Sequence, residues 1–212
     1  MTDAYRTLAA PAEAVYTERR SRFIAYAIPV GSEEEVKVNV QALRKKYYDA
    51  RHVCYAYALG YDGERTRAVD DGEPSGTGGK PILGRIRNAG LTFTLVAVVR
   101  YFGGIQLGAA NLGTAYKTAA AAALENASTA ERVIKAEIRT AVPYPDADAA
   151  MRIARDEGAD IAAFDCGPTE ERITFAIRRG AADSLRKKLQ EIYPLRILDD
   201  EPELTGSRPP QD

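Results

Sequence analysis

The sequence predicts an α+β protein of two domains. Its 212 residues are 45% hydrophobic, which is enough apolar material for two small cores or one large one. Strand-like and helix-like patterns alternate up to about residue 130, and the elements beyond that point become short and regular. Their order, strand, helix, strand, strand, helix, strand, is the βαββαβ or ferredoxin-like pattern. We therefore expect a first domain over residues 1–130, a second over 131–201 and a polar, disordered tail over 202–212.

The first elements of the N-terminal domain carry clear local signals. SRFIAYAIPV (21–30) is rich in aromatic and β-branched residues and predicts a strand. Ser32 with Glu35 three residues later is a capping box, so a helix should run from about Glu33 to Tyr48. HVCYAYAL (52–59) alternates in side-chain type and predicts a second strand. An Asp-Gly turn follows, which predicts a short returning strand over residues 64–70.

Later elements follow from composition. ILGRIRNAG (82–90) fits a helix that ends at glycine. LTFTLVAVVRYF (91–102) is almost entirely apolar, as in a central strand covered on both faces. The alanine-rich segment 115–127 predicts a helix, because alanine loses no side-chain entropy there. In the second domain we expect strands at 131–142, 159–166, 171–179 and 194–199 and helices at 145–158 and 181–193.

Charge, cysteine content and hydropathy limit the function classes. The 29 basic and 30 acidic residues leave a net charge of −1, so no global field attracts nucleic acid or a membrane surface. Cys54 and Cys166 are far apart, and the first residues lack a secretory signal, which is typical of reduced thiols in a cytoplasmic protein. The longest apolar run, 91–99, is too short to cross a bilayer. We expect no membrane partner.

The stretch DDGEPSGTGGKP (70–81) is the first candidate site. It is not a phosphate-binding P-loop, because Pro74 and Pro81 stand where that motif needs glycine and a hydroxyl. Pro81 is tolerated only in a first helical turn, so a helix should begin between Thr77 and Lys80. The amides of residues 76–80 would then favour an anion. A tightly turned helix entry without a ligand explains the same residues equally well.

The acidic residues of this stretch, Asp70, Asp71 and Glu73, have two readings. They could bind a divalent metal, but the spacing of a calcium loop is absent. Pairing with local arginines such as Arg65 or Arg67 is the better supported alternative. We predict no metal site and no cofactor.

A second glycine-rich corner, RYFGGIQLGAAN (100–111), follows the predicted central strand. Gln106 and Ala109 break the dinucleotide-binding pattern. Arg100 stands at the carboxyl end of the strand, where ligands gather in open α/β sheets, although close packing of helix on strand would also require glycine. The candidate anion- or nucleic-acid-binding residues are Thr77, Gly78, Gly79, Lys80, Arg100 and Lys117.

His52 and Cys54 share one face of a predicted strand. A Cys-His catalytic pair is conceivable, but residues at such positions are more often part of the core. With only three Cys and His residues in the chain, a zinc site is not expected. No catalytic residue is assigned, and whether the protein is an enzyme stays open.

Four stretches together resemble one family. DDGEPSGTGGKPIL (70–83) and VVRYFGGIQLGAANLGTAY (98–116) resemble the signature of the YigZ/IMPACT family, and residues 18–27 and 50–59 resemble its earlier blocks. Gln106 stands where that family commonly has lysine. The resemblance implies the bacterial YigZ branch, with an N-terminal α/β domain similar to GHMP kinases and a ribosomal small-subunit protein, and a C-terminal domain similar to the last domain of elongation factor G. Eukaryotic relatives regulate a starvation-responsive kinase that acts on translation initiation.

Three functions fit these observations. The first is a non-catalytic regulatory protein linked to translation, which contacts RNA, the ribosome or a regulatory protein through the loops 70–81 and 100–111. The second is an enzyme that acts on a phosphorylated or anionic small molecule in the same cleft. The third is a protein–protein adaptor. The first is favoured, because the family resemblance points to translation, and the oligomeric state stays open.

Overall fold

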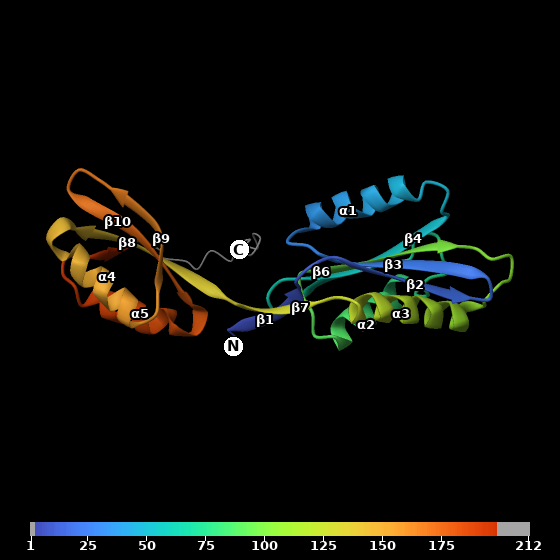
Figure 1. The fold of residues 1–212 in the computed structure, drawn as a ribbon. Coiled ribbons are helices and arrows are strands. Elements are labelled where there is room, and N and C mark those ends of the chain that lie inside the picture. Colours follow the sequence, from blue (N-terminus) through green and yellow to red (C-terminus); the bar gives the residue numbers. More distant parts are fainter. Residues whose placement is uncertain (1–2, 199–212) are drawn as a thin grey trace. The chain divides into compact units, whose positions relative to one another are not determined.

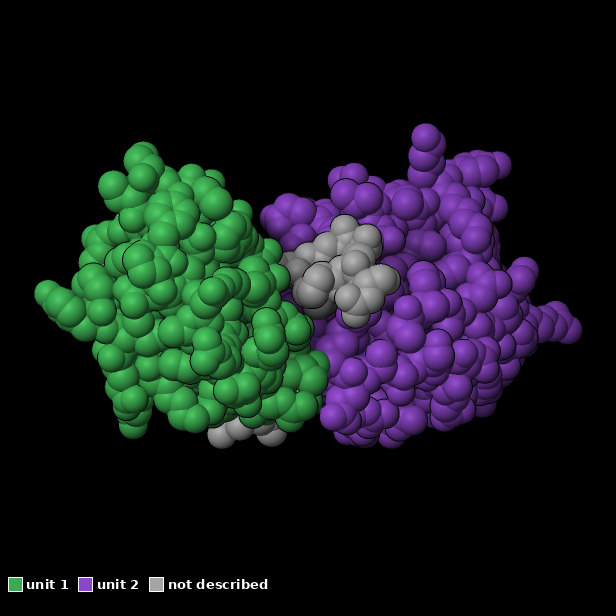
Figure 2. All heavy atoms as spheres, turned by 60° about the vertical axis from the view of Figure 1, so that its left-hand side comes forward, with its two compact units in different colours: residues 1–4, 133–205 green, residues 5–132, 206–212 purple. Residues whose placement is uncertain are grey.

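The computed structural model describes residues 3–198, which fold into two compact units (Figure 2). One unit contains residues 5–132, and the other contains residues 3–4 and 133–198. Each unit combines helices with an antiparallel sheet, so the α+β class predicted from the sequence is confirmed. The predicted tail, residues 202–212, lies outside the described residues. None of the helices between residues 3 and 198 has the length and hydropathy needed to span a membrane.

A five-stranded antiparallel sheet forms the centre of the first unit. In spatial order its strands are β2 (Ala12–Glu18), β3 (Ser21–Pro29), β6 (Thr94–Tyr101), β4 (His52–Leu59) and β5 (Arg65–Val69). Helix α1 (Glu33–Lys46) covers one face, and α2 (Gly79–Asn88) and α3 (Ala109–Glu125) cover the other (Figure 1). Strand β6 is therefore central and buried on both faces, as its apolar sequence requires.

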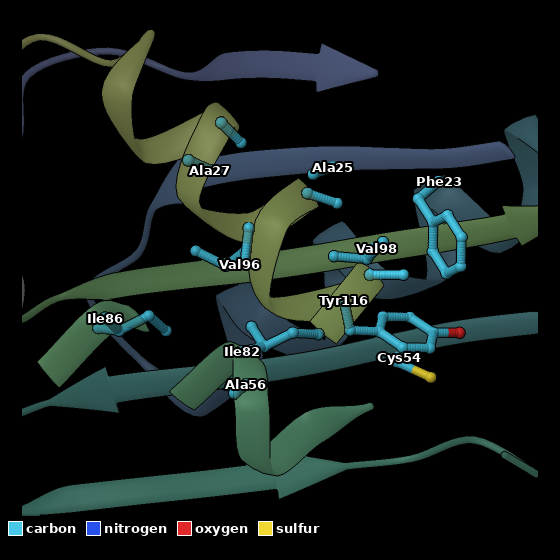
Figure 3. Packing of buried hydrophobic residues seen from close by; sticks show 14 of the residues in the cluster. Phe23, Ala25, Ala27, Cys54, Ala56, Ile82, Ile86, Val96, Val98 and Tyr116 are labelled. Atoms are coloured by element: carbon cyan, nitrogen blue, oxygen red, sulfur yellow. The ribbon is translucent and has the colours of Figure 1, made fainter. Parts of the chain in front are cut away.

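The main core of this unit lies between the sheet and helices α2 and α3. Small alanine side chains on α3 allow the helix to approach the sheet closely, and Tyr116 fills the remaining space near Phe23 (Figure 3). The rings of Tyr116 and Phe23 are 5.1 Å apart and nearly perpendicular, a favourable aromatic geometry. This packing fixes α3 against β3 and β6, and thereby positions the loops at the helix starts.

Local sequence signals set most element boundaries in this unit. The Oγ atom of Ser32 accepts a hydrogen bond from the Glu35 amide at 3.2 Å, which caps α1 as predicted. Helix α2 begins at Gly79, within the range that Pro81 predicts. Helix α3 begins at Ala109 rather than at residue 115, because glycine and asparagine in its first turns are tolerated once tertiary packing holds them.

Two strands near the N-terminus are not predicted from the sequence. β1 (Ala4–Leu8) pairs with β7 (Thr129–Val133), and β2 forms an edge of the five-stranded sheet. The expected strand over 131–142 is split at Ile134, whose amide donates to the carbonyl of Asp3 and whose carbonyl accepts from the amide of Arg179. These bonds divide the segment into β7 and β8.

The second unit follows the chain order β-α-β-β-α-β. Its elements are β8 (Lys135–Pro143), α4 (Ala147–Asp156), β9 (Asp160–Cys166), β10 (Glu170–Arg178), α5 (Ala182–Gln190) and β11 (Arg196–Ile197), with short 3-10 turns at Tyr144–Asp146 and Arg179–Ala181. The strands lie in the spatial order β11-β8-β10-β9. Alternate residues of β10, such as Ile173 and Phe175, pack with α4 and α5 in one core. Strand β11 is shorter than the predicted 194–199.

Candidate functional site

The loop between β5 and α2 is organised around the carboxylate of Asp70. Oδ2 of Asp70 accepts a hydrogen bond from the Gly76 amide at 2.7 Å, and Oδ1 accepts from the amides of Gly78 and Gly79 at 2.9 and 2.8 Å. Burial raises the pKa of the Asp70 carboxyl, but the three amides together outweigh it and leave the pKa below its ordinary value. The amides do favour an anion, and that anion is a side chain of this protein.

Thr77 also turns inward. Its amide and its hydroxyl both donate to the carbonyl of Pro74, at 3.0 and 2.6 Å. The expectation that Thr77, Gly78 and Gly79 offer free amides to an external ligand is thus corrected. The amides are engaged because Asp70 lies close enough to fill the concave backbone that they form.

The other two carboxylates of the loop have separate partners. Asp71 accepts from the Val53 amide at 2.7 Å and pairs with Arg44 at 2.5 Å. Glu73 accepts from Arg100 and from the hydroxyl of Tyr116, and Arg65 and Arg67 are not the partners. Between residues 3 and 198, no three His, Cys, Asp or Glu side chains are grouped in a way that could hold a metal ion.

Arg100 is a buried structural cation. Its guanidinium donates to Glu73 Oε1 at 2.7 Å, and the side chains of the two residues are only 9% and 4% exposed. The guanidinium carbon lies 5.6 Å from the ring centre of Phe23 and 5.7 Å from that of Phe102. These groups surround Arg100, so its guanidinium does not face solvent. This differs from the expectation that Arg100 is available to an anionic ligand.

His52 and Cys54 of β4 contact the backbone of the same loop through their side chains. His52 Nδ1 lies 2.7 Å from the carbonyl oxygen of Asp71, and the thiol of Cys54 donates to the carbonyl of Asp70 at 2.9 Å. Burial raises the pKa of Cys54 to about 12, so the thiol stays protonated at neutral pH. Both side chains contact carbonyl groups of the loop and so stabilise its conformation. The hypothesis of a catalytic Cys-His pair is not supported.

The two remaining predicted cations, Lys80 and Lys117, meet a third cation, Arg85, on the surface. Lys80 and Arg85 of α2 and Lys117 of α3 line an open hollow of about 410 Å³ between the two helices. Pro81, Gly84, Gly113 and Ala110 contribute small or flat surfaces to it, and its lining contains no acidic residue. Within the described part of the chain, none of the three cations has an ion-pair partner. The hollow therefore carries uncompensated positive charge.

Residues from both glycine-rich segments contribute to this hollow. The first contributes Gly76 and Lys80, and the second contributes Ala110. A Cβ atom added at Gly113 would lie 3.7 Å from the Pro81 side chain, an ordinary contact distance, so α2 and α3 lie close together at this point. The sequence places Lys80 and Lys117 among the candidates, and the structure brings them together.

The sequence reading does not identify Tyr116 as a partner of Glu73, since the two residues lie 43 positions apart. Lys80, Gly84 and Asn88 are spaced four residues apart, so they lie on one face of α2. This spacing is the sequence signal that predicts which residues of α2 line the hollow.

Comparison with known proteins identifies the family. The model of the Impact N-terminal domain matches residues 19–124, half of the chain, and includes both glycine-rich loops. The chain belongs to the IMPACT family. An IMPACT family member of Bacillus subtilis, YvyE, is 35% identical over 144 residues, which are 68% of this chain and 66%, just under two thirds, of that protein. The IMPACT family member in the pol 5′ region of Thermus thermophilus is 44% identical over 128 residues, 60% of this chain and 68% of that protein.

A solved structure extends the likeness of this IMPACT-family chain beyond the first unit. A crystal structure described only as that of "an hypothetical protein" is 27% identical and superposes with a TM-score of 0.72. The match covers 95% of this chain and all of the other. The two-unit fold thus occurs in another protein.

Proposed function

We propose that this IMPACT-family protein is a non-catalytic regulatory protein linked to translation, which binds RNA through the hollow between α2 and α3. The observation that carries the proposal is the meeting of Lys80, Arg85 and Lys117 around a hollow without acidic residues. Phosphate contacts supply most of the affinity in sequence-independent nucleic-acid binding. A chain with a net charge of −1 can provide such contacts only through a local group of cations. The link to translation is carried over from the family.

The carboxylates of the loop 70–81 already have partners within the protein, which supports binding rather than catalysis. A hydrolase or transferase at this hollow needs a general base near the bound anion. The carboxylates of Asp70, Asp71 and Glu73 are held by amides, Arg44 and Arg100. Asn88 and Thr114 are polar residues of the lining, and neither is a base at neutral pH.

The test is a salt titration of RNA binding. Fluorescence anisotropy with a labelled single-stranded RNA should give an affinity that falls with salt, with a logarithmic slope of about −2 for three phosphate contacts. Lys117→Ala should weaken binding and make the slope less negative by about 0.7. Lys37→Ala is the matched control, because Lys37 is an exposed lysine on α1, which covers the opposite face of the sheet.

The outcomes separate the three functions. Affinity that is independent of salt, or equal loss of affinity in both lysine variants, would remove the proposal. Tight binding of a nucleoside phosphate, lost in Lys117→Ala, together with no RNA binding would favour the small-molecule enzyme. Absence of both ligands would favour a protein adaptor.

A further inference from the structure

We infer that the RNA is bound as a single strand, with one unstacked base lying on the ring of Phe102. This inference rests on the proposed function and adds the class of RNA and the residue that selects it. Phe102 directly follows strand β6, is 58% exposed and lies beside the buried cation Arg100.

The ring of Phe102 is held from one side. The guanidinium of Arg100 lies 5.7 Å from the ring centre, and Arg100 is itself fixed by Glu73 and by the ring of Phe23. The cation–π contact restrains the ring of Phe102, while more than half of the surface of this residue remains in solvent. An aromatic side chain that is ordered before binding loses little entropy when a base stacks on it, and stacking accepts any base.

Phe102 is connected to the cationic hollow through contacts within the unit of residues 5–132. Arg100 touches both Phe102 and Glu73, and Gly76, which lines the hollow, follows Glu73 by three residues. Three residues of extended chain span at most about 11 Å. An RNA strand that follows this path would contact Lys80 and Lys117 with its phosphates and Phe102 with one base.

A duplex does not fit this arrangement. In double-stranded RNA the base faces are covered by their neighbours, and side chains cannot read the deep, narrow major groove. Only an unpaired base can present its face to Phe102. The ring thus favours single strands, loops or bulges, while the cations alone would bind any phosphate backbone.

The experiment measures anisotropy of the full chain with an RNA of about 12 nucleotides, offered single-stranded, as a duplex and as an abasic strand. Phe102→Leu keeps an apolar side chain but removes the ring, and Phe102→Tyr keeps the ring. Ile105→Ala is the matched control, because Ile105 is 41% exposed in the same glycine-rich corner and is not aromatic. Circular dichroism and the melting temperature report whether each variant folds.

We expect Phe102→Leu to weaken binding of the single strand by about 5- to 150-fold, the effect of losing one stacked base, with an unchanged salt slope. Phe102→Tyr and Ile105→Ala should bind like the wild type, and the duplex and the abasic strand should bind the wild type more weakly. Equal affinity of Phe102→Leu and wild type for the single strand would overturn the inference, as would equal affinity for the duplex. If Lys117→Ala still weakens binding in that case, the proposed function survives, whereas no RNA binding at all overturns both.

Discussion

Replacing Glu73 by alanine should strongly destabilise the unit of residues 5–132. Glu73 accepts from Arg100 at 2.7 Å and from Tyr116 at 2.8 Å, and its side chain is 4% exposed. Without it, Arg100 keeps a buried charge with no anion, and Nε of Arg100 already lacks a hydrogen-bond partner. Breaking a buried ion pair on one side costs about 3–5 kcal/mol, and the orphaned hydroxyl adds about 1 kcal/mol.

Thermal unfolding followed by circular dichroism measures this loss. A destabilisation of about 4–6 kcal/mol should lower the melting temperature of this unit by about 12–25 °C. The double variant Glu73→Leu with Arg100→Met should recover much of the loss, because an apolar pair of similar volume leaves no buried charge. Glu34→Ala is the control, since Glu34 is 77% exposed and should change stability by about 0.5 kcal/mol or less.

Two results would refute this reasoning. A Glu73→Ala variant within about 1 kcal/mol of the wild type would mean that Arg100 reaches water once its partner is removed. A double variant no more stable than Glu73→Ala would mean that the loss comes from packing and not from the unpaired charge.

Asp70 and Gly79 offer two further tests of the loop. Because the folded pKa of Asp70 lies below its ordinary value, the stability it contributes is complete above about pH 5 and is lost as the pH falls through the folded pKa. The difference in unfolding free energy between wild type and Asp70→Asn, measured in urea, should therefore shrink as the pH is lowered below about 5, and a difference independent of pH would contradict an ionised Asp70. Gly79→Ala should cost about 1–3 kcal/mol or more, because its Cβ would lie 2.3 Å from the backbone nitrogen of Val69. Gly84→Ala, whose Cβ meets no atom within 4 Å, should instead gain up to about 1 kcal/mol, and equal melting temperatures for the two glycine variants would contradict the close approach.

The predictability of the elements follows the range of the interactions that form them. Ser32, Pro81 and the apolar run of β6 act within a few residues, and the elements that they predict are present. The strand pairing of β1 with β7 joins segments more than a hundred positions apart and has no local signal. The split of 131–142 depends on bonds from Ile134 to Asp3 and Arg179, which local propensity cannot reveal.

For the candidate site, the sequence by itself determined which chemical groups are available: carboxylates beside glycine amides in 70–81, and cations near two glycine-rich corners. Only the tertiary structure decided how they pair. The loop amides donate hydrogen bonds to Asp70, and buried Arg100 forms an ion pair with Glu73. Lys80 and Lys117 lie at the surface. The physical reason is that a buried charge must find a partner wherever the fold brings one, whereas an exposed cation is solvated by water and stays available to a ligand.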